Sequence, residues 1–254
     1  MAFKFLKAGK ESADLAAKQA AEAQAYRENQ GKLFRFWLKE QEEARITFVD
    51  GDLSPDGYLV PPRYYEHGLY LNGSWNNFFV CPEKTNPEAK DSCPICVAPD
   101  RPSLVALFTI IDHRTFHGSK DKSKVYVDTK KLMVCKPQTF ELLNKIAMKR
   151  GGLAGCTFDV SRIGDKAAAV GSLFDFVVKT PISELKAKYQ VEKTDPKTNQ
   201  KVKVTNFEVA DYEKEITYRT GDELRKLGLG QIPAAATEQA AEKAGKPVDY
   251  SEQL

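Results

Sequence analysis

The chain has 254 residues, of which 42% are hydrophobic and 10% are aromatic, and its formal net charge is +3. This length suits one large domain or two modest ones, and the apolar content is sufficient for a packed core. No apolar run approaches the roughly 20 residues that cross a bilayer as a helix, so we expect no membrane partner.

Residues 1–31 are predicted to form a basic N-terminal arm and helix outside the core. The tip carries Lys4, Lys7 and Lys10, and a stretch rich in Ala, Glu, Gln and Lys follows from Ser12. This composition has strong helix propensity. Its apolar residues are mostly alanines, so such a helix has little surface to bury against a domain.

Residues 32–230 are predicted to form the core, which is mainly β with helices at its margins (α+β). Alternation of apolar and polar residues predicts strands at 34–38, 44–50, 64–71, 104–112, 125–135, 156–164 and 171–180. Asn72-Gly73 indicates a hairpin, and weaker β patterns occupy 201–209 and 212–218. Predicted helices are 137–150, 182–190 and 222–229, the last with a Thr220/Glu223 capping box.

The predicted strands describe a small, strongly curved β-barrel that carries an inserted loop. Residues 231–254 are rich in Ala, Glu, Lys and Pro and have almost no large apolar residue. We therefore predict a disordered, weakly acidic tail after the core.

The stretch from His67 to Cys96 carries most of the metal-binding chemistry of the sequence. Cys93 and Cys96 have the C-x-x-C spacing with which two thiolates hold one tetrahedral ion from a tight turn, and Cys81 precedes them. We predict one structural Zn²⁺ held by His67, Cys81, Cys93 and Cys96. The ion would stabilise a loop that is too polar to pack by itself. The simplest alternative is ordinary reduced cysteines in a cytosolic domain.

Three other interpretations of the same thiols remain open. His113 and His117 could complete a two-Cys-two-His finger, although the intervening apolar run predicts a strand instead of a finger helix. A redox C-x-x-C would require a thioredoxin-like context, which the sequence does not show. A zinc deaminase would require an H-x-E motif, which is absent at His67.

The sequence predicts no enzymatic activity. The phosphate-binding, dinucleotide, metalloprotease and nucleophile-elbow motifs do not occur. Four protein ligands would also leave the predicted zinc without the open position that a catalytic metal keeps for water.

Basic residues concentrate after the cysteine-rich stretch, and aromatic residues are interleaved with them. Residues 112–150 contain ten Lys or Arg and four Asp or Glu. Cations that track a phosphate backbone, together with rings that stack on unpaired bases, are typical of single-strand binding. The predicted DNA contacts are Arg63, Tyr64, Arg114, Phe116, Lys120, Lys122, Lys124, Tyr126, Lys130 and Lys131.

The ordered motifs His67-Gly68, Asn72-Gly73-Ser74-Trp75, Cys81 and Asp91-Ser92-Cys93-Pro94-Ile95-Cys96 carry a family resemblance. They resemble the zinc-containing, helix-destabilising single-stranded DNA-binding proteins of T-even phages. The whole chain is also similar to single-stranded DNA-binding proteins of other tailed phages.

The resemblance implies an OB-fold with a zinc subdomain inserted at about residues 61–103, and DNA in a basic, aromatic cleft between them. It implies cooperative, sequence-nonspecific coating of single-stranded DNA during phage replication, recombination and repair, in the cytoplasm of the infected bacterial host. Lys4, Lys7 and Lys10 would then contact the neighbouring protomer along the strand. An acidic tail would recruit phage replication proteins, but the tail here is short and only weakly acidic.

A different class of function also fits the sequence. The zinc module could belong to an adaptor or transcription regulator that acts through protein–protein contacts. Such a protein would form a stable complex with its partner in the absence of nucleic acid.

Overall fold

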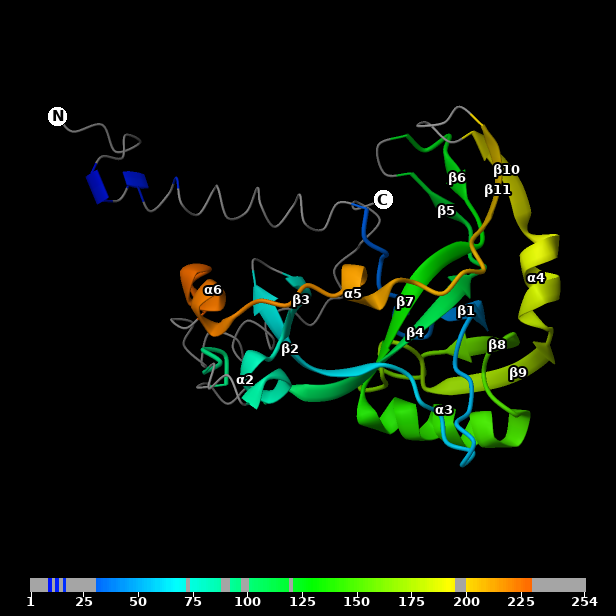
Figure 1. Ribbon diagram of the computed structural model, residues 1–254, viewed down its shortest axis with the longest axis horizontal. Helices are drawn as coiled ribbons and strands as arrows, with labels where there is room; N and C mark the ends of the chain where they lie inside the picture. The colour runs from blue at the N-terminus through cyan, green and yellow to red at the C-terminus, as the bar shows by residue number, and fades with distance from the viewer. Residues whose placement is uncertain are drawn as a thin grey trace.

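The computed structural model describes residues 9–10, 12–13, 16, 31–71, 74–87, 92–96, 101–118, 121–194 and 200–229. Within them the fold is mainly antiparallel β-structure with few helices (Figure 1). Lys10 is helical and exposed, whereas Lys4, Lys7 and the predicted tail 231–254 lie outside the described residues. The division into arm, core and tail therefore stays a prediction. No helix in the described part is both long and apolar enough to cross a membrane.

Seven strands form the main sheet, and all their pairings are antiparallel. They are β1 (Glu43–Phe48), β2 (Arg63–Leu71), β3 (Ser74–Val80), β4 (Ser103–Asp112), β7 (Thr129–Cys135), β8 (Cys156–Ser161) and β9 (Leu173–Lys179). Their order is β3-β2-β4-β1-β8-β9, and β7 pairs with β4. One edge of β4 meets β2 at its start and β1 at its end, so β4 connects the β2–β3 hairpin to the rest of the sheet.

The predicted strand at 34–38 is an extended crossing segment with a single parallel bridge, between Arg35 and Leu132. The Phe36 amide donates to the Leu132 carbonyl at 2.7 Å, and the Leu38 amide donates to the Ala169 carbonyl at 2.7 Å. The segment therefore leaves β7 after a few residues and reaches the loop that follows β8. Because its hydrogen bonds are divided between two partners, it cannot form a regular strand.

The core lies between the inner face of this sheet and helix α3 (Pro137–Arg150). Phe48 contacts Phe108 and Phe158 edge to face, with ring centroids 5.6 and 5.8 Å apart. On α3, Leu143 is fully buried, and the predicted neighbours Phe140 and Ile146 pack partly buried against the same core. The helix has the predicted bounds, since proline occupies its first turn and a left-handed glycine follows it.

The predicted long strand at 125–135 is interrupted. Asp128 has φ +53°, which ends β6 (Val125–Tyr126) and lets the chain begin β7 in a new direction. β6 pairs with β5 (Phe116–His117), and together they form a small hairpin that projects from the sheet (Figure 1).

The C-terminal third supplies α4 (Ile182–Lys188), the hairpin of β10 (Gln190–Thr194) and β11 (Lys201–Thr205), α5 (Tyr212–Glu215) and α6 (Gly221–Lys226). The predicted weak strand at 212–218 is wrong, because residues 212–215 form one helical turn instead. The Tyr212 hydroxyl bonds Asp50 and Thr109, which attaches this turn to the outer face of β4. The predicted Thr220/Glu223 capping box at α6 is confirmed.

Candidate functional site

The four predicted metal ligands lie together at the end of the β2–β3 hairpin. The possible donor atoms of His67, Cys81, Cys93 and Cys96 all lie within 4.8 Å of one another. The His67 Nε2 atom is 3.4 Å from the Cys93 Sγ atom and 3.5 Å from the Cys96 Sγ atom. The Sγ atoms of Cys81 and Cys96 are 3.6 Å apart.

These separations suit one tetrahedral ion. Zinc–sulfur bonds of about 2.3 Å and zinc–nitrogen bonds of about 2.0–2.1 Å place tetrahedral ligands about 3.5–3.8 Å apart. A disulfide would require a sulfur–sulfur distance of about 2.05 Å, and all five cysteines are free thiols. The four residues could therefore hold one metal ion, and a soft thiolate and imidazole donor set is the kind that zinc prefers.

The local fold explains how the ligands converge. His67 faces Phe79 in the β2–β3 register, so the hairpin brings the end of β3 beside it. The Cys81 amide then donates to the Tyr65 carbonyl at 2.8 Å, which fixes Cys81 at the start of the short helix α2 (Pro82–Thr85). Glu83 accepts from the Cys93 amide at 3.3 Å and so positions the turn that carries the C-x-x-C pair.

Burial favours the protonated form of these thiols in the absence of a cation. It raises the pKa of both Cys93 and Cys96, and their proximity to Cys81 raises it further. A metal ion must therefore displace protons as it binds, because only the thiolate is a ligand. With four protein donors the site would be closed, which is typical of a structural metal.

Helix α6 packs against the loop that carries Cys93 and Cys96, a contact that the sequence did not predict. Leu224 and Leu229 are buried in one cluster with Cys81, Cys93 and Ile95. The Arg225 guanidinium donates to the Ser92 carbonyl at 2.9 Å and also bonds the Ser92 hydroxyl. The capping box predicted the helix, but nothing in the local sequence indicated which surface it would cover.

The rival histidines lie elsewhere. His113 Nε2 is 2.8 Å from the Thr47 hydroxyl, and His113 Nδ1 is 2.5 Å from an Asp128 carboxylate oxygen. His117 is exposed on β5, with its Nδ1 atom 3.3 Å from the Lys122 carbonyl. Among the described residues it is His67 that shares a cluster with the cysteines.

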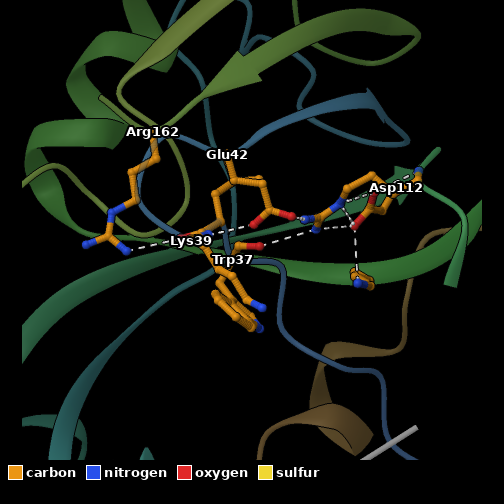
Figure 2. A network of polar contacts seen from close by, with 8 residues as sticks. Trp37, Lys39, Glu42, Asp112 and Arg162 are labelled. Carbon is orange, nitrogen blue, oxygen red and sulfur yellow. Dashed lines mark hydrogen bonds and ion pairs between the residues drawn. The ribbon is translucent and has the colours of Figure 1, made fainter. Parts of the chain in front are cut away.

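Two of the predicted DNA contacts, Arg114 and Lys131, belong to an internal charge network. Arg114 forms ion pairs with Glu42 at 2.6 Å and with Asp112 at 2.7 Å, and Lys131 lies 3.2 Å from the same Asp112 oxygen. Figure 2 shows the carboxylates of Glu42 and Asp112 turned toward each other across this network, with the Trp37 carbonyl beside them.

The network is a buried one. Asp112 is fully buried, and burial alone would raise its pKa. Hydrogen bonds and charge from Arg114, with the charge of Lys131, outweigh burial and hold the pKa of Asp112 below its usual value. Phe116 completes the arrangement, since the Lys131 ammonium lies 3.8 Å from its ring centroid. These cations stabilise the end of β4, and their predicted DNA contact stays a prediction.

Tyr64 and Lys130, two more of the predicted DNA contacts, are also partly buried within the protein. The Tyr64 hydroxyl donates to Glu66 and accepts from Arg35 at 3.1 Å, and burial raises its pKa. Lys130 is half-buried, and its pKa is lowered by burial despite the charges of Glu208 and Glu215 nearby.

The exposed members of the predicted set fall into two separate groups. Lys122, Lys124 and Tyr126 are exposed on the β5–β6 hairpin, whereas Lys120 lies outside the described residues. Arg63 is exposed at the other end of β4, where it pairs in register with Ala106. Ala106 lies six positions before Asp112 on β4, which corresponds to about 20 Å.

Comparison of the chain with protein-family models, with curated proteins and with solved structures found no match.

Proposed function

We propose that this protein is a metal-stabilised, OB-fold protein that binds single-stranded DNA without sequence preference. The succession β1, β4, β7, α3, β8 and β9 supports the proposal. An OB-fold is a five-stranded, partly open Greek-key barrel that binds oligonucleotides with the face of its second and third strands and the adjacent loops. Among the described residues β7 and β9 are not paired with each other, so the predicted barrel is not closed. In this assignment β4 and β7 are the second and third strands. The metal module, at about residues 61–103, is then inserted between the first and the second strand.

The observation that carries the functional proposal is the free basic hairpin between β4 and β7. Within the described residues, the side chains of Lys122 and Lys124 have no carboxylate partner, and Tyr126, two positions after Lys124, is 44% exposed. Unlike Arg114 and Lys131, these lysines keep their charge available for phosphates. An exposed ring next to free cations can stack on an unpaired base, whereas the bases of a duplex are already stacked on each other.

The metal would have a structural role in this proposal. Zn²⁺ held by His67 and the three cysteines would fix the β2–β3 hairpin and the loop that α6 covers. In the cleft that the resemblance implies, it would thereby maintain one wall, at the end of β4 opposite the β5–β6 hairpin. The partial cover of this module by α6 favours a structural role over the alternative of a zinc-module adaptor, which needs the module exposed to a partner.

The biological setting of the proposal rests on the family resemblance. The protein would coat single-stranded DNA during phage replication, recombination and repair in the cytoplasm of the infected host. The arm residues Lys4, Lys7 and Lys10 would contact the next protomer along the strand. Deletion of residues 2–10 is expected to lower cooperativity on long strands more than affinity for a single site.

The hairpin contact can be tested by the salt dependence of binding. For single strands, log K falls by about 0.7 per log unit of salt for each phosphate that is neutralised. We expect Lys122→Ala/Lys124→Ala to flatten that slope by about 1.4 and to leave thermal stability unchanged. Lys226→Ala, which removes an exposed charge on α6, is the matched control. An unchanged slope in the double variant would show that the hairpin does not contact the strand.

A further inference from the structure

Four cations lie close to aromatic rings in contacts shorter than 4 Å among the described residues. The pairs are Arg35 with Phe78, Arg63 with Phe140, Lys131 with Phe116, and Arg150 with Phe176. Arg35 and Lys131 are also paired with buried carboxylates, which neutralise them. The guanidinium groups of Arg63 and Arg150 have no hydrogen bond or ion pair within the described residues.

Both of these unneutralised pairs involve α3. Phe140 lies in its first turns, and Arg150 is its last residue. The helix and its N-cap also carry Lys136, Lys145 and Lys149, all exposed, against a single acid, Glu141. The exposed side of α3 is therefore basic, and the neighbouring loop 51–61 adds two exposed acids, Asp52 and Asp56. The helix is remote from the β5–β6 hairpin (Figure 1).

A groove of about 380 Å³ opens where α3 meets the loop that precedes β2. It is lined by Tyr58, Leu59, Val60, Pro61, Arg63, Phe140 and Asn144. Large apolar side chains are held out in solvent at its rim, since Tyr58 is 60% exposed and Val60 is 63% exposed. The Arg63 guanidinium carbon lies 3.6 Å from the Phe140 ring centroid and forms a flat, charged wall.

The backbone of the rim is fixed by hydrogen bonds. The Ser54 amide donates to the Tyr58 carbonyl at 2.8 Å, and the Gly57 amide donates to the Ser54 carbonyl at 2.8 Å. Asn144 on α3 accepts from the Leu59 amide at 2.9 Å, which ties the loop to the helix. A loop whose backbone is already fixed reduces the entropy cost of binding a flat ligand.

We infer that this groove is a second site for single-stranded nucleic acid, in which an unpaired nucleobase lies between Tyr58 and the Arg63–Phe140 pair. The flanking phosphates would meet Lys136 and Lys145. The inference rests on the proposed single-strand binding and extends it to a surface at the opposite end of β4. Because the hairpin and the groove lie at opposite ends of β4, the two sites should contribute separately to binding.

The test is a fluorescence titration of oligo(dT) with the full chain and with variants whose substituted side chains are exposed. One base stack is worth about 1–3 kcal/mol, so Tyr58→Ala should weaken binding by about 5- to 150-fold, and Tyr58→Phe should retain it. Tyr126→Ala measures, in the same titration, how much the β5–β6 hairpin contributes to binding. An oligonucleotide containing 5-iodouracil should cross-link to the peptide that contains Tyr58, and Arg63→Ala should reduce that cross-link.

The outcomes separate the two proposals. If Tyr58→Ala binds as well as the wild type while Tyr126→Ala is weakened, the groove is not a nucleobase site and the proposed function stands. If the wild type does not bind the single strand at all, the proposed function is wrong, and the inference is wrong with it.

Discussion

Removal of the metal should release α6, because the helix depends on the loop that the metal would hold. Six residues are too few for a helix that is stable in isolation. Its order comes from the burial of Leu224 and Leu229 against Cys81, Cys93 and Ile95. Burial of two leucine side chains stabilises by about 3–6 kcal/mol.

Hydrogen exchange measures this release directly. The Leu224 amide donates to Thr220 and the Leu227 amide donates to Glu223, so both should be protected while the helix is docked. A loss of about 3 kcal/mol on chelation should accelerate their exchange by about 150-fold. The amide of Leu143 in α3, far along the chain from the metal ligands, should exchange at an unchanged rate.

Two further measurements test whether metal binding and the docking of α6 are coupled. Leu224→Ala in the metal-loaded protein should reproduce the fast exchange of α6 while metal content is preserved. Equal exchange of the α6 amides before and after the metal has been removed, with metal loss verified by elemental analysis, would refute the coupling.

Three other expected outcomes follow from the structure. Burial raises the pKa of Asp50 to about 6, against an ordinary value of 3.8. Between about pH 4 and pH 6 the folded state therefore binds a proton that the unfolded state has released, and the unfolding free energy falls as pH rises through this range. The fall in unfolding free energy should approach about 3 kcal/mol in the wild type and be absent in Asp50→Asn. Denaturant titrations at several pH values measure it, and the same pH dependence in both proteins would contradict the prediction. Asp112→Asn should destabilise the protein by about 3–5 kcal/mol in denaturant titrations, because the largely buried Lys131 would lose its carboxylate partner and Arg114 would keep only its ion pair with Glu42. Unchanged stability would contradict the structural role of this network. His67→Ala should lose the bound metal whereas His113→Ala should retain it, and full metal content in the first variant would overturn the ligand set.

The elements that the sequence predicts best are those with local boundary signals. Pro137 and Gly151 delimit α3, and Thr220 with Glu223 marks the start of α6. The cluster of candidate metal ligands was predictable for a related reason, since its four residues lie within one short stretch and C-x-x-C spacing in a polar loop is typical of a metal site.

The sequence did not predict which segments of the chain pack against each other. Asp112 counted as one acid in a basic segment, but its burial beneath Arg114 and Lys131 depends on the β4–β7 register. The docking of α6 on the metal loop joins residues more than 120 positions apart, as the bond from Arg225 to Ser92 shows. The alternating pattern at 34–38 is strand-like, but its hydrogen bonds go to two different neighbours.

The measurement that tests the central claim most directly is binding of the metal-loaded protein to single-stranded and duplex DNA of one sequence over a range of salt. We expect tighter binding of the single strand, together with affinity that falls steeply as salt rises. Equal affinity for the two forms, or an affinity that salt does not change, would contradict the proposed function.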